Sequence, residues 1–465
     1  MLKNKKLIDF LIKYRIEFIC ALIFLCAFIR LFVPIFAIFA FAIAVFGVIL
    51  EADIKGIYYI GFVFSFRFIF RFQSDEIYLF IFLICVWLLI MAIKFIVDKK
   101  YKNKGILIYG ISIAVLVIYI LIPRKGFRGI VNAIKLIMVI FSVYLCCVYK
   151  EDLNIKRFVL IFISSVLLSS VLALHRYSIP TLDRMIGINI THDYTTVRFM
   201  GIDRDPNFYT VSLLVPMATI MVLYLKGDLK WYILYPLMLC LMCFGFRTIS
   251  KSFVLGLVVL LAMFGMLALV KQRRKGRLTI LGIVVVTLIA CLICNNYIGY
   301  MLQRLDVLAN TDIGVENLQN TPALVDEGLL SGLTTGRTDI WKEYFNYFKE
   351  NPIKFIFGSG FERTEITRAS HNTIIQGIYC IGVVGVLYIG ALMIGYIIMQ
   401  IRKKFSVFEY MPLIVFAVLS MALDYFVSTS AISYLILGLF VINYECKEDE
   451  PCANLICQLS RKKKS

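Results

Sequence analysis

Residues 77–97 read IYLFIFLICVWLLIMAIKFIV and contain a single charged side chain, Lys94. As an α-helix, an apolar run of this length crosses the hydrocarbon core of a bilayer, which takes about 20 residues. Similar runs follow along the chain, at residues 106–122, 129–148, 158–174, 207–225, 231–246, 252–270, 278–296, 373–399, 408–424 and 427–444. The sequence therefore predicts an all-α integral membrane protein, a polytopic bundle of transmembrane helices.

Two N-terminal segments leave the number of spans open. Residues 16–50 are almost continuously apolar but are interrupted at Arg30 and Pro34, so they form either two short spans or one long, broken span. Residues 54–72 are apolar but contain Arg67 and Arg71. Because charged side chains are unfavourable at the bilayer centre, this span is doubtful. We expect about 12–14 transmembrane helices in all.

The excess of basic residues indicates the topology. The chain has 465 residues, of which 61% are hydrophobic and 17% charged, and its formal net charge is +19. Short basic loops beside membrane spans remain in the cytoplasm, which places both termini there, together with the loops at 98–105, 149–157, 226–230, 271–277 and 400–407. Nucleic-acid binding is not expected, because no basic stripe with interleaved stacking aromatics is present.

This topology divides the chain into six segments. Residues 175–206 form the first outer loop and residues 297–372 a large extracytoplasmic loop that has more Asp and Glu than Lys and Arg. A loop of this length is usually functional or disordered, and its helical pattern and turn residues predict that it is folded and functional. The remaining segments are N-terminal, central and C-terminal groups of transmembrane helices and a basic cytoplasmic tail, at residues 1–174, 207–296, 373–444 and 445–465.

The cysteines do not indicate a disulfide framework. All thirteen lie in predicted spans or in the tail, and none lies in the two outer loops. Two pairs, Cys240/Cys243 and Cys291/Cys294, have C-x-x-C spacing. Within an apolar helix, cysteine is usually a small hydrophobic residue rather than a metal ligand or redox centre.

The first outer loop ends in a charged stretch. Asp205 and Pro206 are favourable as N-cap and first residue of the next helix. Arg198 and Arg204, beside a membrane surface, are suited to hold a phosphate through bidentate, charge-assisted hydrogen bonds. Asp203-Arg204-Asp205 also has the D-x-D pattern of a metal-dependent glycosyltransferase, but the flanking arginines and the capping role of Asp205 disfavour a metal site.

A second basic pair lies between the spans at 231–246 and 252–270. Arg247 and Lys251 stand at the outer ends of these spans. Cations at a membrane boundary commonly extend to lipid headgroups. In the functional interpretation, Ser250 and Ser252 cap the next helix while Arg247 or Lys251 points to an anionic ligand.

The large loop contains a predicted helix. Residues 310–331 are rich in Asn, Asp, Glu and Gly and are expected to form a mobile flap. Helical periodicity then runs from Asp339 to Glu350, with an aromatic face that includes Trp341, and is typical of an interfacial helix on the outer leaflet. Gly336 and Arg337 directly precede it, at the positive end of the helix dipole, where phosphates are favoured.

His371 is one of only three histidines and lies at the mouth of a predicted span. By the predicted topology it is on the same face as Arg198, Arg247, Lys251 and Arg337. Neighbouring arginines favour the neutral imidazole, which can accept a proton. Asn372 could orient His371 or a substrate.

These elements, in this order, resemble the O-antigen ligase/polymerase superfamily of Wzy and WaaL proteins. The resemblance covers about residues 190–400. It rests on Arg198-x-x-Gly201, Pro206-Asn207, Ser250-Lys251, Gly336-Arg337-Thr338-x-x-Trp341, Gly358-x-Gly360 and His371-Asn372-Thr373. One departure is Ser250-Lys251, where many members have Ser-Arg, which leaves open whether Arg247 or Lys251 supplies that cation.

The resemblance implies a GT-C-like, metal-independent glycosyltransferase of the bacterial cytoplasmic (inner) membrane. Its substrate would be an undecaprenyl-diphosphate-linked oligosaccharide, with membrane lipid and a chain-length regulator protein as further partners and no cofactor. The diphosphate would lie among Arg198, Arg204, Arg337 and Arg247 or Lys251. His371 would be the general base, with Gly336, Trp341 and Asn372 in support.

Three activities remain open at this point. A polymerase of O-antigen, capsule or exopolysaccharide repeat units is the first hypothesis, and a ligase that transfers the glycan to an acceptor is the second. A flippase or other transporter is the third, because such proteins also have 12 to 14 spans. Transporters usually consist of two related halves with broken helices at the midplane, and no such halving is visible in the sequence.

Overall fold

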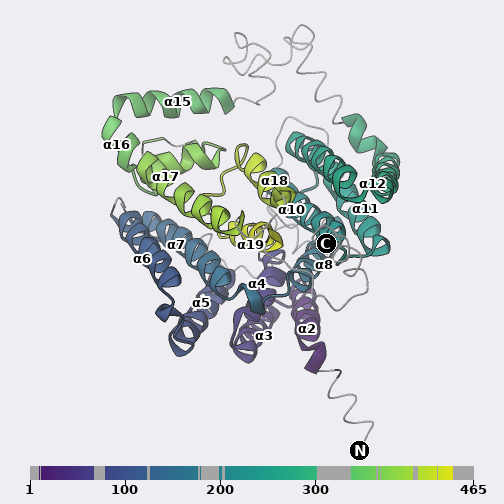
Figure 1. Cartoon of the computed structure of the whole chain (residues 1–465), viewed down its shortest axis with the longest axis horizontal. Coiled ribbons are helices and arrows are strands. Elements are labelled where there is room, and N and C mark those ends of the chain that lie inside the picture. The colour runs from purple at the N-terminus through teal and green to yellow at the C-terminus, as the bar shows by residue number, and fades with distance from the viewer. Residues whose placement is uncertain are drawn as a thin grey trace, which may run out of the picture.

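The structure is a computed structural model of the chain. It describes residues 10, 12–67, 79–122, 126–175, 179, 198–201, 205–300, 337–362, 365–366, 368–401, 407–426 and 428–442. In these residues all regular structure is helical, which confirms the predicted all-α class (Figure 1). The α-helices are α2 (Arg15–Arg30), α3 (Phe36–Glu51), α4 (Ile57–Phe64), α5 (Leu79–Val97), α6 (Lys104–Leu121), α7 (Gly126–Val148), α8 (Ile155–Leu174), α10 (Pro206–Leu225), α11 (Trp231–Arg247), α12 (Lys251–Ile293), α15 (Arg337–Glu350), α16 (Pro352–Phe357), α17 (Thr373–Ile401), α18 (Met411–Ser420) and α19 (Ala431–Ile442).

Eight helical stretches of the described chain are long and apolar enough to cross a membrane. They are α5, α6, α7, α8, α10, most of α17 and two parts of α12, Lys251–Leu269 and Gly276–Ile293. Both parts of α12 line one cavity, so they lie side by side. The protein is therefore a multi-pass membrane protein in which shorter helices, among them α3, α11 and α18, accompany the eight long ones.

The structure shows which helices the two doubtful N-terminal segments form. Residues 16–50 form two separate helices, α2 and α3, with Pro34 in the turn between them. The segment at 54–72 contains α4, which has only 8 residues. A helix of this length extends about 12 Å, against about 30 Å of hydrocarbon, so α4 does not cross the bilayer by itself.

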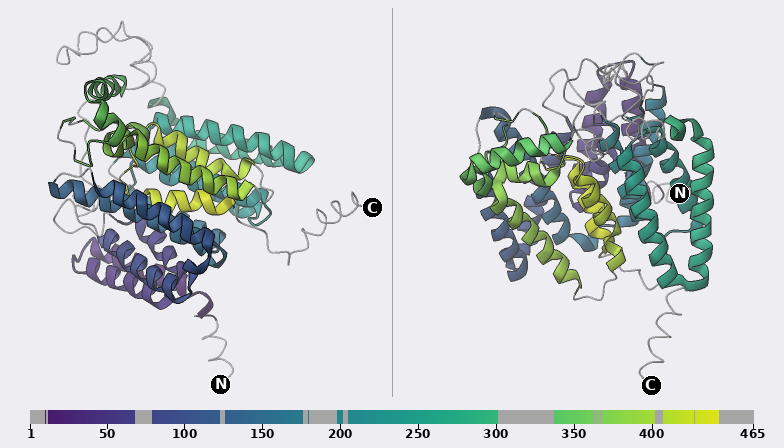
Figure 2. Two further views of the ribbon diagram at one scale, coloured as in Figure 1. Left: turned by 60° about the vertical axis from the view of Figure 1, so that its left-hand side comes forward. Right: turned by 90° about the horizontal axis from the view of Figure 1, so that it is seen from above.

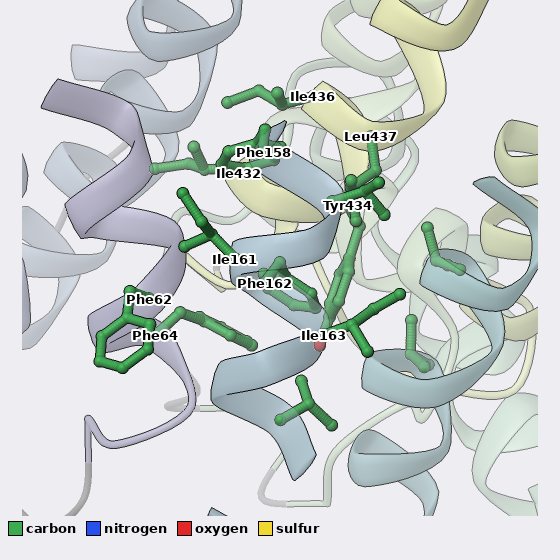
Figure 3. Packing of buried hydrophobic residues seen from close by; sticks show 14 of the residues in the cluster. Phe62, Phe64, Phe158, Ile161, Phe162, Ile163, Ile432, Tyr434, Ile436 and Leu437 are labelled. Carbon is green, nitrogen blue, oxygen red and sulfur yellow. The ribbon is translucent and has the colours of Figure 1, made fainter. Parts of the chain in front are cut away.

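The centre of the bundle is aromatic and aliphatic. All residues of α4 are buried, and its Phe64 ring stacks on Phe162 of α8 with the ring centroids 5.5 Å apart. Figure 3 shows these rings beside Tyr434 of α19, whose hydroxyl group is 2.6 Å from the hydroxyl of Ser212 in α10. Of the eight candidate spans, α10 is the most completely buried, and its first residues are consequently held in a fixed position.

Contacts between helix termini define two ends of the bundle. At one end, called the outer end after the predicted topology, the first residues of α10, α12, α15 and α17 meet the last residues of α11 and α18. At the other, the inner end, the first residues of α2 and α8 and the last of α3 and α10 are joined by side-chain contacts. Figure 2 shows α15 and α16 projecting at the outer end.

The helix α17 is interrupted at Gly382, where φ is 70° and ψ is 173°. The carbonyl oxygens of residues 379–381 accept hydrogen bonds from outside the helix: from Ser359 N at 2.7 Å, Gly360 N at 3.1 Å and the Tyr119 hydroxyl at 2.7 Å. Backbone groups released by a helix break must find partners when water is excluded. The glycine-containing turn after α16, residues 358–361, provides two of them and is therefore docked on α17.

Candidate functional site

Arg198 is fixed where three helix termini meet. Its Nε donates to the carbonyl oxygen of Thr248 at 3.1 Å, and its Nη2 donates to Oδ1 of Asn207 at 3.4 Å. The Ser250 hydroxyl donates to the same amide oxygen at 2.7 Å. Asn207 is in the first turn of α10, and Thr248 and Ser250 join α11 to α12. Ser250 is the N-cap residue of α12 but makes no capping hydrogen bond, so the predicted capping by its side chain is wrong.

The bend between α11 and α12 has an unusual backbone. Ile249 has a φ of 50°, and β-branched residues are genuine outliers in this region. The Thr248 hydroxyl holds the bend, because it donates to the carbonyl oxygen of Gly245 at 2.7 Å and accepts from Ser250 N at 3.2 Å. Strain of this kind, about 1–3 kcal/mol, persists where the surroundings impose it and is concentrated at functional sites.

Gly201 is required by its surroundings. Its φ is 58°, and a Cβ atom there would lie 2.5 Å from the ring of Tyr209. The Tyr209 hydroxyl is hydrogen-bonded to the buried hydroxyl of Ser170 in α8, so the ring cannot move aside without loss of that bond. This close approach brings the segment that carries Arg198 onto α10.

Arg247 and Lys251 flank the same bend. The Arg247 guanidinium lies over the ring of Tyr297, 5.2 Å from its centroid, and the Arg247 carbonyl oxygen accepts a hydrogen bond from Phe199 N at 3.1 Å. Lys251 is the first residue of α12 and is half-buried. Both predicted cations therefore flank the group formed by Arg198, Asn207, Thr248 and Ser250, called the Arg198 cluster. The Arg247 guanidinium is directed to an aromatic ring.

Arg337 approaches this cluster from the large loop. It is the first residue of α15, two residues before the predicted start of that helix. Burial lowers the pKa of Arg337, and the negative charge of Asp205 acts in the opposite direction. Asp205 is the N-cap of α10, as predicted, and its Oδ1 accepts from Asn207 N at 2.6 Å. In the described part of the chain the Arg337 guanidinium has no hydrogen bond or direct ion pair.

The position of Arg337 attracts an anion. A cation at a helix N-terminus is disfavoured by the helix dipole, which favours negative charge there. A half-buried guanidinium in that position, close to a second helix N-terminus at α10, is stabilised when an anion binds.

Trp341 links α15 to the segment that contains His371. Its indole Nε1 donates to the carbonyl oxygen of Ser370 at 2.8 Å. Tyr344 and Phe348, on the same face of α15, are buried, and the Tyr344 ring packs on Tyr379 of α17 at 5.6 Å between centroids. The aromatic face that predicted an interfacial helix thus packs partly on protein, whereas Phe345 is 50% exposed.

His371 has a left-handed backbone with a φ of 48°. Histidine enters this region more often than most residues, but here it is held by Ser370, whose hydroxyl donates to the carbonyl oxygen of Asn372 at 2.9 Å. The Asn372 side chain caps α17 and donates to the carbonyl oxygen of Met421 at 3.0 Å. The Asn372 amide is therefore occupied by backbone groups and fixes the position of His371 through the chain.

These interactions place the predicted residues at the same end of the bundle. Arg198 contacts Asn207 in α10, Asp205 at the start of α10 interacts with Arg337, and Trp341 bonds to the residue before His371. Arg204 and Gly336 lie outside the described residues, as do Asp203 and the expected flap at 310–331. Within the described chain no cluster of three or more His, Cys, Asp or Glu side chains could hold a metal ion.

Three contributors were not assigned a site role from the sequence. The sequence indicates Asn207 and Ser250 only as parts of motifs that carry the resemblance, Ser250 also as a helix cap, and it does not single out Ser370. It indicates Asp205 only as a cap and a weak metal ligand. The signal that points to Asn207 is its place in the Pro206-Asn207 motif, directly after a capping aspartate at a predicted outer helix start.

Part of the candidate site lies in a region of the chain that matches a known protein family. Residues 236–390 match a family model described as O-antigen ligase. The match covers about a third of the chain. Comparisons with curated proteins and with solved structures gave no match. The matched region includes Arg247, Lys251, Arg337 and His371, whereas Arg198 and Asn207 precede it.

The match to the O-antigen ligase family model supports the predicted resemblance to the O-antigen polymerase/ligase superfamily. It implies an enzyme related to glycosyl transfer that acts on lipid-linked glycans in a membrane. It does not support a flippase. Arg337 and Ser370, the residue before His371, are brought together by the bond from Trp341 of α15, which is a property of the tertiary structure.

Proposed function

We propose that the protein polymerises oligosaccharide repeat units carried on undecaprenyl diphosphate, at the outer face of the bacterial cytoplasmic membrane. The observation that carries the proposal is the placement of Arg198, Arg337 and His371 at the outer end: Arg198 bonds to Asn207, the charge of Asp205 acts on Arg337, and Trp341 bonds to Ser370 beside His371. The product would be an O-antigen, a capsule or an exopolysaccharide. Both termini would be cytoplasmic.

The cations would bind the donor diphosphate. Arg198 and Arg337, with Lys251 or Arg247 at the border, would surround the leaving group. As the bond between the anomeric carbon and the diphosphate oxygen breaks, the electron pair remains on the diphosphate. Preorganised cations stabilise charge that develops in a transition state. This is the chemistry that would allow transfer without a metal ion.

His371 would activate the acceptor. A hydroxyl oxygen of the acceptor sugar forms the new bond to the anomeric carbon, and its proton passes to the neutral imidazole. General base catalysis of this kind contributes typically about 10²–10⁴-fold. The left-handed backbone of His371 supports this role, because strained residues are concentrated at active sites.

The second candidate is a ligase that transfers the complete glycan to a different acceptor. The description of the matched family favours it. Both reactions use the same donor and the same leaving group, so the described site suits either. They differ in the acceptor, which is another lipid-linked repeat unit for a polymerase.

The test is a gene deletion complemented by wild type or by His371→Ala, with surface glycan separated on a gel and lipid-linked glycan extracted. A polymerase predicts loss of the ladder while a single repeat unit still reaches the surface. A ligase predicts loss of all attached glycan with accumulation of lipid-linked polymer.

His175→Ala is the matched control, because His175 is a histidine at the outer end of α8 with no assigned role. It should restore the wild-type ladder. A normal ladder from His371→Ala at normal protein level would refute the proposed base, and a deletion without any glycan defect would refute the proposed function.

A further inference from the structure

The side-chain amide of Asn207 has a fixed orientation. A guanidinium only donates hydrogen bonds, so the Asn207 atom 3.4 Å from Arg198 Nη2 must be the amide oxygen. The Ser250 hydroxyl, 2.7 Å from the same atom, donates to it as well. Assignment of amide oxygen and nitrogen normally depends on such a network, and here Arg198 decides it.

The amide nitrogen must therefore face away from Arg198 and Ser250. It has no polar partner among the described residues, and the Asn207 side chain is only half-buried. Asn207 lies in the first turn of α10, two residues after the cap Asp205, whose charge acts on Arg337. Two N–H donors are thus available in the first turn of α10.

We propose that Asn207 binds the lipid-linked substrate directly, by donating from its amide nitrogen to an oxygen of the diphosphate while its amide oxygen positions Arg198. The inference rests on the proposed function and adds a binding residue that lies outside the matched family region. A phosphate oxygen is the suitable acceptor because Asn207 holds the cation Arg198 through its amide oxygen, and a second cation, Arg337, interacts with Asp205 two residues before it.

The carboxylate of Asp205 lies next to this position. One of its oxygens already accepts from Asn207 N at 2.6 Å, and its charge interacts with Arg337. The anion attraction therefore comes from the two arginines, and Asn207 contributes directed hydrogen bonds that a carboxylate at this position could not make.

The decisive variant is Asn207→Asp. It preserves the size of the side chain and the oxygen that Arg198 and Ser250 contact, but it replaces the donating NH₂ group by a negative oxygen. Purified protein in detergent is titrated with undecaprenyl diphosphate, and binding is followed by thermal shift. We expect affinity to fall at least tenfold with the melting temperature of the unliganded protein retained. A merely structural Asn207 predicts the opposite, because a carboxylate would hold Arg198 more tightly.

Asn207→Ala provides a second measurement if Asn207→Asp fails to fold, since it introduces no charge. It should weaken binding about fivefold or more, and wild-type affinity would overturn the inference. Asn154→Asp is the matched control, because Asn154 caps α8 at the inner end by accepting from Arg157 N at 3.0 Å, and aspartate caps equally well. Failure of the wild type to bind undecaprenyl diphosphate would contradict the proposed function, whereas tight binding by both wild type and Asn207→Asp would contradict only the role of Asn207.

Discussion

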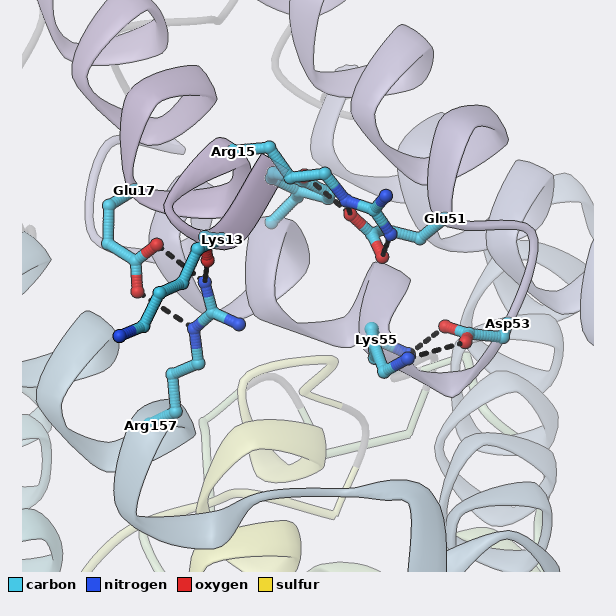
Figure 4. A network of polar contacts seen from close by, with 8 residues as sticks. Lys13, Arg15, Glu17, Glu51, Asp53, Lys55 and Arg157 are labelled. Atoms are coloured by element: carbon cyan, nitrogen blue, oxygen red, sulfur yellow. Dashed lines mark hydrogen bonds and ion pairs between the residues drawn. The ribbon is translucent and has the colours of Figure 1, made fainter. Parts of the chain in front are cut away.

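The cations at the two ends of the helical bundle have different partners. At the inner end, Arg15 forms an ion pair with Glu51 at 2.6 Å, Arg157 bonds to Glu17 with Nε 2.8 Å from Oε1, and Lys226 lies 3.1 Å from Glu409 (Figure 4 shows the first two). At the outer end, Arg198 contacts a carbonyl and an amide, Arg247 an aromatic ring, and Arg337 has no direct ion pair in the described chain. The inner cations join helices, whereas Arg198, Arg247 and Arg337 lie at helix termini of the outer end.

The difference separates structural charge from functional charge. A buried ion pair is satisfied internally, and removal of one partner leaves the other charge uncompensated. Cations held by neutral groups keep their attraction for an external anion. The outer end also contains a structural pair, Lys354 with Glu365 at 2.7 Å, which lies beside α16 and not among the arginines. Ion pairing, and not the end of the bundle alone, therefore distinguishes these structural cations from Arg337, which has no direct ion pair in the described chain.

The largest effect is expected for Arg337→Ala. Loss of a half-buried cation beside the diphosphate should reduce polymer formation by about 100-fold or more, the loss typical of one transition-state donor. Arg337→Lys should also be impaired if the contact is bidentate. The measurement is the glycan ladder in a complemented deletion strain, with protein level checked. Arg368 is an exposed arginine of the same loop, and Arg368→Ala should give a normal glycan ladder. Equal ladders from Arg337→Ala and Arg368→Ala would show that Arg337 has no special role in polymer formation.

An intermediate effect, on stability alone, is expected for Glu51→Gln. The Glu51 side chain is fully buried against Arg15, and the change leaves that cation without its charge partner. Thermal unfolding in detergent should show a loss of about 1–3 kcal/mol, with unchanged affinity for undecaprenyl diphosphate in the folded protein. Lys342→Ala, which breaks an exposed pair with Asp339, should change stability by less than about 0.5 kcal/mol. Weakened ligand binding by Glu51→Gln would show that the inner pairs are not merely structural.

The smallest effect is expected for Trp341→Phe. This change keeps an aromatic ring on α15 but removes the hydrogen bond to the Ser370 carbonyl oxygen. A bond worth about 1 kcal/mol corresponds to roughly fivefold in an equilibrium, so glycan synthesis should fall by about that factor through misplacement of Arg337 relative to His371. Tyr344→Phe, which loses the bond to the Arg368 carbonyl oxygen, is the comparison variant. If Trp341→Phe is no worse than Tyr344→Phe in glycan yield, Trp341 is only a packing residue.

The sequence by itself determined the fold class and the approximate positions of the helices. Apolar runs such as residues 77–97 leave few alternatives, because backbone polar groups in a membrane must be satisfied within the helix. The same local rules placed Asp205 as a cap and α15 within two residues of its start. The order of motifs also sufficed to indicate the superfamily of residues 236–390.

Only the tertiary structure decided how these pieces meet. The break of α17 at Gly382 depends on partners supplied by Ser359, Gly360 and Tyr119, which are distant in the sequence. The orientation of Asn207 depends on Arg198 and Ser250, and the state of Arg337 depends on burial near Asp205. Periodicity and capping are properties of neighbouring residues, whereas charge compensation and hydrogen-bond direction are set by groups that folding alone brings within reach.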